Sequence, residues 1–166
     1  MSSFLTPLKL EYVDGRTWKV DAPFRYDVGA EDSGESIVVP AGTLTDFASI
    51  PRFFWRLLPP TGEYGKAAVI HDWLYQNLGI IQQHLAYDVS PRLREYTRKQ
   101  CDDIFLDAMS VLGVPAWKKR AMHGAVRAFG WSAWNSHRQR LSVVRSYPSG
   151  NVVCVIPNEQ ENPTQQ

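Results

Sequence analysis

The first forty residues alternate between hydrophobic and polar positions, which is the pattern of strands that bury one face. Residues 8–12 and 18–20 carry this alternation on either side of Asp14-Gly15. Because an Asp-Gly pair between two alternating segments favours a tight turn, we expect a β-hairpin here. The same pattern predicts two further strands, over 24–28 and 36–39.

From residue 52 onward the hydrophobic positions recur at helical spacing. The pattern predicts one short helix and three longer ones, over 52–58, 64–78, 94–112 and 115–135. Ser90-Pro91 is interpreted as the boundary before the second long helix, since proline favours the start of a helix. Gly113-Val114-Pro115 predicts that this helix stops and that the third one then begins.

The C-terminal region predicts a second β-hairpin, in which 141–147 and 151–156 flank a turn at 148–150. Residues 158–166 are polar and rich in Gln, Asn and Pro, so we expect a disordered tail. Strands, helices and strands follow one another in this order, which predicts a single α+β domain over 1–157. Its expected parts are N-terminal antiparallel strands, a central bundle of three longer helices with one short helix, and the C-terminal hairpin.

The composition narrows the function classes. A chain of 166 residues can form one hydrophobic core, and 44% of its residues are hydrophobic and 21% charged. The net charge of +1 argues against a nucleic-acid surface that relies on bulk charge. A cluster of basic residues is compatible with a local phosphate-binding patch, although we favour the interpretation that these residues form a solvated helix face. This cluster consists of Lys118, Lys119, Arg120, Arg127, Arg138 and Arg140.

The sequence contains no pattern of a targeting or membrane segment. Residues 1–7 lack the basic run and the apolar segment of a secretory signal. No stretch approaches the roughly 18 consecutive apolar residues that a membrane helix requires. We therefore expect a cytoplasmic protein, unless it leaves the cell within a larger assembly.

A histidine and an aspartate interrupt the apolar faces of two of the long helices. The first face consists of Ala67, Ile70, His71, Leu74, Tyr75 and Leu78, and the second of Arg98, Cys101, Asp102, Phe105, Met109 and Leu112. Burying an unpaired carboxylate costs several kcal/mol, so a buried Asp102 needs a partner. We predict that Asp102 faces His71 across the helix pair.

This pairing has two interpretations. His71 is a general base whose tautomer and orientation Asp102 fixes, or the two residues form a buried polar pair that ties two helices together. Asp72 and Asp46 are candidate metal ligands, since carboxylates suit calcium or magnesium and carboxylates with imidazole suit zinc. The alternative makes Asp46 a turn or capping residue and Asp72 a solvated flank.

Several motifs of this chain resemble the domain of unknown function 1353 family of tailed phages, prophages and bacteria. They are Thr45-Asp46-Phe47-Ala48-Ser49-Ile50-Pro51, His71-Asp72-Trp73-Leu74-Tyr75, Asp102 through Phe105 with Ala108-Met109, Gly113-Val114-Pro115 and Gly130-Trp131. The resemblance covers roughly 39–134. It implies a phage or prophage setting with virion or tail proteins as partners, and it implies the host cytoplasm or the virion as the location.

The His-Asp-x-x-Tyr and Asp-x-x-Phe segments are also similar to the core of phospholipase A2 enzymes. This likeness implies that His71 activates water, that Asp72 binds calcium, and that Asp102 orients His71 with support from Tyr75. The substrate would be a lipid or another ester. The glycine-rich calcium loop of those enzymes has no counterpart before His71, where Gly62 and Gly65 are the only nearby glycines.

Two functions are therefore expected, and they differ in class. One is a metal-assisted, phospholipase A2-like ester hydrolase with His71 as general base. The other is a non-catalytic virion, tail or assembly component that binds other proteins, in which His71 and Asp102 are structural. A hydrolase requires an open cleft above His71, whereas a structural component requires a sealed His71 and an exposed aromatic patch.

Overall fold

The computed structural model describes residues 3–15, 17–29, 35–46, 64–83 and 92–145. Within these ranges the N-terminal part forms short antiparallel strands. They are β1 (Ser3–Phe4), β2 (Leu10–Asp14), β3 (Thr17–Val20), β4 (Phe24–Asp27), β5 (Ser36–Val39) and β6 (Leu44–Thr45). These strands form two three-stranded sheets, with the orders β1-β4-β5 and β2-β3-β6.

The predicted N-terminal hairpin is confirmed. In β2 and β3, Leu10 lies opposite Val20 and Tyr12 lies opposite Trp18. Gly15 has a φ of +46° in the connecting turn, a conformation that glycine adopts without steric cost. The strands expected over 24–28 and 36–39 are β4 and β5, whose buried side chains face the helices as part of the core.

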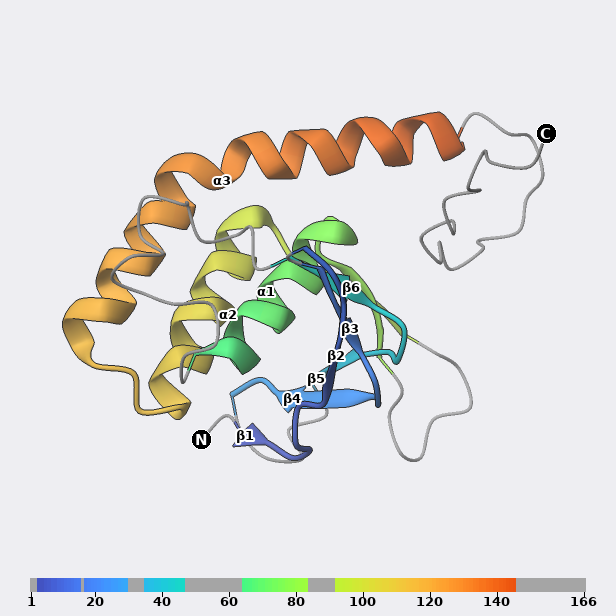
Figure 1. The fold of residues 1–166 in the computed structure, drawn as a ribbon. Coiled ribbons are helices and arrows are strands. Elements are labelled where there is room, and N and C mark those ends of the chain that lie inside the picture. Colours follow the sequence, from blue (N-terminus) through green and yellow to red (C-terminus); the bar gives the residue numbers. More distant parts are fainter. Residues whose placement is uncertain (1–2, 16, 30–34, 47–63, 84–91, 146–166) are drawn as a thin grey trace.

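Three helices follow the strands in the described part of the chain: α1 (Gly65–Gln76), α2 (Arg98–Val111) and α3 (Ala116–Arg145). Between α1 and α2 lies a two-stranded ladder of β7 (Ile80–Gln83) and β8 (Arg92–Glu95). Figure 1 shows α1 between α2 and the N-terminal strands, while α3 runs along the outside and changes direction along its length. Eight of the twelve residues of α1 are buried, so α1 is the centre of the core.

Tight caps fix the ends of α1 and α2. The N–H of Gly79 donates to Leu74 O and that of Leu78 to Tyr75 O, which is the hydrogen-bond pattern of a Schellman motif. The same pattern closes α2 at Gly113, which has a φ of +72°. Gly79 also contacts the residue that follows β8, because the N–H of Tyr96 donates to the carbonyl oxygen of Gly79 at 2.9 Å.

The α+β class is confirmed, and several predicted boundaries are wrong. The second long helix begins at Arg98 because Thr97 and Gln100 form a capping box, and residues 94–95 belong to β8. The strand β7 lies in a segment for which the pattern gave no prediction. The third helix extends ten residues beyond 135, so residues 141–145 are helical and do not form the first arm of a C-terminal hairpin. The rest of that hairpin, the helix over 52–58 and the tail lie outside the described residues.

No helix in the described ranges is both long enough and apolar enough to cross a lipid bilayer.

Gly79→Ala and Gly113→Ala form a matched pair that tests the packing of β8 on the end of α1. Both glycines have φ above +70°, so each alanine costs about 1 kcal/mol of backbone strain. A Cβ at Gly79 would also overlap the carbonyl of Tyr96, whereas a Cβ at Gly113 meets open space. Urea unfolding should show the larger loss of stability for Gly79→Ala, by about 2 kcal/mol or more. Equal losses would contradict the described contact.

Candidate functional site

The predicted pairing of His71 with Asp102 is confirmed. His71 lies in the middle of α1 and Asp102 in the first half of α2, and the Nε2 atom of His71 is 2.9 Å from Oδ1 of Asp102. The side chains are 1% and 0% exposed, respectively. The two residues therefore form a polar centre inside the helical core, where most of the buried residues of both helices are apolar.

Both carboxylate oxygens of Asp102 accept hydrogen bonds. Oδ1 accepts from His71 and from the hydroxyl of Tyr75, which lies at 2.6 Å. Oδ2 accepts from Nη1 of Arg127 at 2.9 Å, and Nη1 of Arg98 lies 3.5 Å away. Because these donors come from α1, α2 and α3, Asp102 joins all three helices.

The environment of Asp102 determines the charge on the carboxylate. Burial by itself raises the pKa of Asp102, but the hydrogen bonds from His71, Tyr75 and Arg127 outweigh burial and hold this pKa below its ordinary value. Burial raises the pKa of Tyr75, and the hydrogen bond to Asp102 raises it further. Asp102 is therefore the anion at neutral pH, and the phenol of Tyr75 keeps its proton.

These partners also fix the tautomer of His71. An ionised carboxylate only accepts hydrogen bonds, so Nε2 carries the proton that points at Asp102. In the neutral imidazole Nδ1 is then the basic nitrogen with a free lone pair. Nδ1 is buried and has no hydrogen-bond partner among the described residues.

Aromatic rings hold the imidazole of His71 in place. The ring centroid of Tyr75 lies 4.2 Å from that of His71, and the centroid of Phe105 lies 4.8 Å away. Tyr75 in turn meets Trp134 of α3 edge-on at 5.1 Å. The sequence places His71 and Tyr75 one helical turn apart, which is why both reach the same oxygen of Asp102.

The candidate metal ligands Asp72 and Asp46 lie in different environments. Asp72 is 5% exposed, and its Oδ2 accepts a hydrogen bond from Thr45 Oγ1 at 2.5 Å, which ties β6 to α1. Asp46 is exposed at the end of β6. The described part of the chain contains no group of three or more His, Cys, Asp or Glu side chains placed to hold a metal. The predicted solvated flank at Asp72 is wrong because Asp72 is buried.

From the sequence, we did not predict that two arginines belong to the site. Arg127 belongs to the basic cluster for which we favoured a solvated face, yet it binds Asp102 and is only 35% exposed. Arg98 lies four residues before Asp102 on the same helix face, a spacing that favours an ion pair. Its guanidinium also donates to the carbonyl oxygens of Val126 and Arg127. No pattern in the sequence indicates the contact between Arg127 and Asp102, which depends on how α3 packs.

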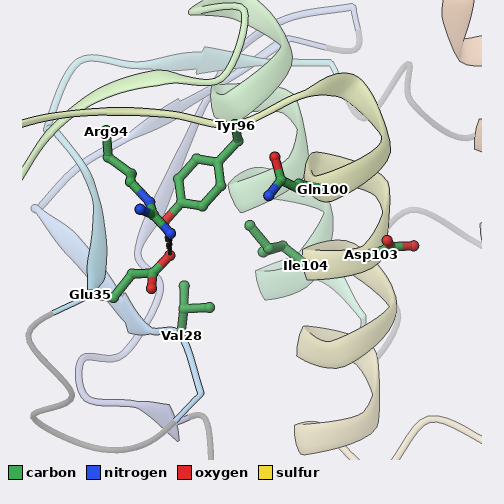
Figure 2. Close-up of a pocket in the computed structure, with 7 residues that line it drawn as sticks. All are labelled: Val28, Glu35, Arg94, Tyr96, Gln100, Asp103 and Ile104. Carbon is green, nitrogen blue, oxygen red and sulfur yellow. Dashed lines mark hydrogen bonds and ion pairs between the residues drawn. The ribbon is translucent and has the colours of Figure 1, made fainter.

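A separate pocket of about 270 Å³ lies between α2 and the ends of the strands. Figure 2 shows Tyr96 and Arg94 on one side and Gln100 and Ile104 of α2 on the other. Glu35 accepts hydrogen bonds from the Tyr96 hydroxyl at 2.6 Å and from Arg94 at 3.3 Å. Its lining contains neither His71 nor Asp102, so this pocket gives no access to the polar centre.

The close approach of α3 to Tyr75 is testable with two glycines of the same helix. A Cβ at Gly130 would lie 2.5 Å from the Tyr75 hydroxyl oxygen, which the bond to Asp102 holds in place, whereas a Cβ at Gly124 meets nothing within 4 Å. Gly130→Ala should lower the free energy of unfolding by about 1–3 kcal/mol. Gly124→Ala should raise it by up to about 1 kcal/mol, because alanine favours the helix. A stabilised Gly130→Ala variant would show that α3 does not pack there.

The charge of Asp102 predicts a specific pH dependence of stability. Since the folded pKa lies below the ordinary value of about 4, the stabilisation is complete above pH 4 and is lost as the pH falls through the folded pKa. Asp102→Asn should lower the free energy of unfolding by about 3 kcal/mol at pH 7, and the difference from the unmodified chain should shrink below pH 4.

The control is Asp103→Asn. Asp103 is 42% exposed and pairs with Lys99 and His123, so its loss should cost less than about 1 kcal/mol. Urea unfolding from pH 2.5 to 7 measures both variants. A difference between Asp102→Asn and the unmodified chain that stays constant down to pH 2.5 would contradict a buried anion.

Comparison with known sequences identifies relatives of this chain. Residues 18–126 match the family model described as "Protein of unknown function (DUF1353)". The uncharacterized protein y4jT of Sinorhizobium fredii (strain NBRC 101917 / NGR234) is 32% identical over 115 residues, which are 68% of this chain and 29% of that protein. The chain thus spans less than a third of the length of this relative. No solved structure matches the chain. The predicted family is confirmed: with its polar centre inside the matched segment, the chain belongs to the DUF1353 family of proteins of unknown function.

Proposed function

We propose that the chain is a hydrolase of esters or related bonds, with His71 as its general base. The observation that carries the proposal is the Nδ1 atom of His71, which is buried and without a hydrogen-bond partner among the described residues. Buried polar atoms are nearly always hydrogen-bonded, and exceptions concentrate where chemistry requires them. On the opposite nitrogen, Asp102 supplies what a general base needs, a fixed tautomer and a negative charge.

In the proposed reaction Nδ1 takes a proton from a water molecule whose oxygen attacks the ester carbonyl. The imidazolium that forms is stabilised by Asp102, which stays ionised because Arg127 and Tyr75 bind it as well. The C–O bond to the leaving group then breaks, and the imidazolium returns its proton to the leaving alkoxide. The products are a carboxylic acid and an alcohol.

The similarity of the His-Asp-x-x-Tyr and Asp-x-x-Phe segments to phospholipase A2 supports this choice of reaction and a lipid ester as substrate. In this chain Tyr75 donates to Asp102, as that likeness implied. Calcium is not assigned a step, because Asp72 and Asp46 alone supply too few oxygens for an ion that takes six to eight. A calcium site would need further oxygen ligands, such as backbone carbonyls or water molecules.

The second candidate is a virion, tail or assembly component of a phage or prophage that acts by protein binding. It is favoured by the 1% exposure of His71. It is also favoured by the position of Asp102, whose hydrogen bonds and ion pairs hold three helices together. Under this function His71 and Asp102 contribute stability and fold specificity, and no substrate reaches Nδ1.

The experiment that separates the two functions measures hydrolysis and folding on the same proteins. The substrates are p-nitrophenyl acetate, p-nitrophenyl octanoate and phospholipid vesicles, each with calcium and with EDTA. His71→Ala should reduce turnover at least about a hundredfold while circular dichroism shows a folded protein. Tyr75→Phe, which removes only the hydroxyl, should retain more activity than His71→Ala.

His123→Ala is the matched control, since His123 also pairs with an aspartate of α2 but lies outside the polar centre. It should leave turnover unchanged. Absence of hydrolysis of all three substrates by the unmodified chain, or equal activity in His71→Ala, would contradict the hydrolase and favour the second candidate.

A further inference from the structure

The charges of the chain are unevenly distributed along the sequence. The segment 116–145, which forms α3, contains seven of the eighteen Lys and Arg residues and none of the seventeen Asp and Glu residues. The rest of the chain therefore has eleven cations against seventeen acids. The net charge of +1 is therefore the sum of a strongly basic segment 116–145 and an acidic remainder of the chain.

The basic side chains of α3 differ in what they contact. Those that face α2 are bound: Arg127 by Asp102, His123 by Asp103 and Lys119 by Ser110. Arg120 and Arg138 are exposed, and no carboxylate of the described ranges pairs with either. Their positive charge is therefore available to a partner.

These two arginines share a helix face with two tryptophans. We call this face the outer stripe; its exposed residues recur at spacings of three or four and are Trp117, Arg120, Gly124, Ala128, Trp131, Asn135 and Arg138. Trp117 is 60% exposed and Trp131 is 58% exposed. Figure 1 shows α3 along the outside of the molecule.

We propose that the outer stripe binds single-stranded nucleic acid. Guanidinium groups bind backbone phosphates, and exposed indole rings provide flat surfaces on which unpaired bases stack. From Trp117 to Trp131 the stripe extends over about 20 Å of helix at 1.5 Å per residue, enough for several nucleotides. Charge complementarity identifies the partner as a polyanion, and the interleaved tryptophans identify it as one with accessible bases.

A membrane surface fits these residues less well. A helix that lies in a lipid interface has a continuous apolar face opposite a polar one. Met122 and Val126 of α3 are buried in the core, and Phe129 is exposed outside the outer stripe. Within the stripe, Arg120 and small residues separate the two tryptophans, so the apolar surface of α3 is not one continuous face. Duplex DNA would supply the phosphates, but its paired bases are not available for stacking.

The test is fluorescence anisotropy of labelled 20-nucleotide dT and U strands, titrated with the unmodified chain from about 50 to 200 mM salt. We expect micromolar binding that weakens as salt rises. Trp117→Ala/Trp131→Ala should weaken binding at least about tenfold at every salt concentration, because it removes stacking. Arg120→Gln/Arg138→Gln should reduce the slope of log K against log salt by about 1.4, since each phosphate contact contributes about 0.7 for a single strand.

Lys9→Gln/Lys99→Gln removes the same charge from exposed positions outside α3 and should leave the salt slope and the affinity nearly unchanged. None of these substitutions touches the polar centre, so the result is independent of the proposed hydrolase. The proposal is overturned if neither strand binds, or if the α3 variants bind like the control variant. Binding of a 20-base-pair duplex as tight as that of the single strands would also overturn the proposal. So would binding of phosphatidylglycerol vesicles that is tighter than binding of the single strands and that the α3 substitutions weaken in the same way.

Discussion

A buried carboxylate with donors from three helices organises this molecule. An isolated ionised Asp102 in the core would be too costly to fold, so its neighbours must be in place for the helices to pack. His71 and Tyr75 bring α1 to it, and Arg127 brings α3. Removing any one donor leaves the charge less compensated, which makes the packing of the three helices mutually dependent. The close approach at Gly130, where a larger residue would displace Tyr75, follows from the same constraint.

Helical periodicity in the sequence predicts the part of this centre that lies on α1 and α2. His71 and Asp102 stand out because each interrupts an apolar face, and the cost of burial is enough to predict that they meet. Periodicity cannot indicate which basic residue of a third helix completes the site, and Arg127 therefore looked like one more surface cation. The same limit applies to boundaries: Thr97 and Gln100 cap α2 through side-chain bonds, which compete with the start favoured by Ser90-Pro91. The strands β7 and β8 form because they pair with each other, and neither has a strong pattern alone.

The geometry around His71 and Asp102 is compatible with both candidate functions, but different features of it favour each one. A fully hydrogen-bonded Asp102 stabilises the core under either function, whereas the Nδ1 atom of His71, which has no partner among the described residues, supports the hydrolase. The near-complete burial of His71 is the observation that separates them most, since a base must meet its substrate. The proposed contact with nucleic acid uses the outer stripe of α3, which does not include the side chains that bind Asp102. Both features belong to one helix, because Arg127 faces inward while Arg120 and Arg138 face outward.

The protonation of the His71 ring tests the central claim most directly. Nitrogen-15 NMR of the imidazole in its neutral form distinguishes a protonated from an unprotonated ring nitrogen. We expect a proton on Nε2, retained by the bond to Asp102, and an Nδ1 signal typical of an unprotonated nitrogen. A neutral ring with its proton on Nδ1 would mean that Asp102 does not accept from Nε2, and it would contradict the buried anion as the organising interaction.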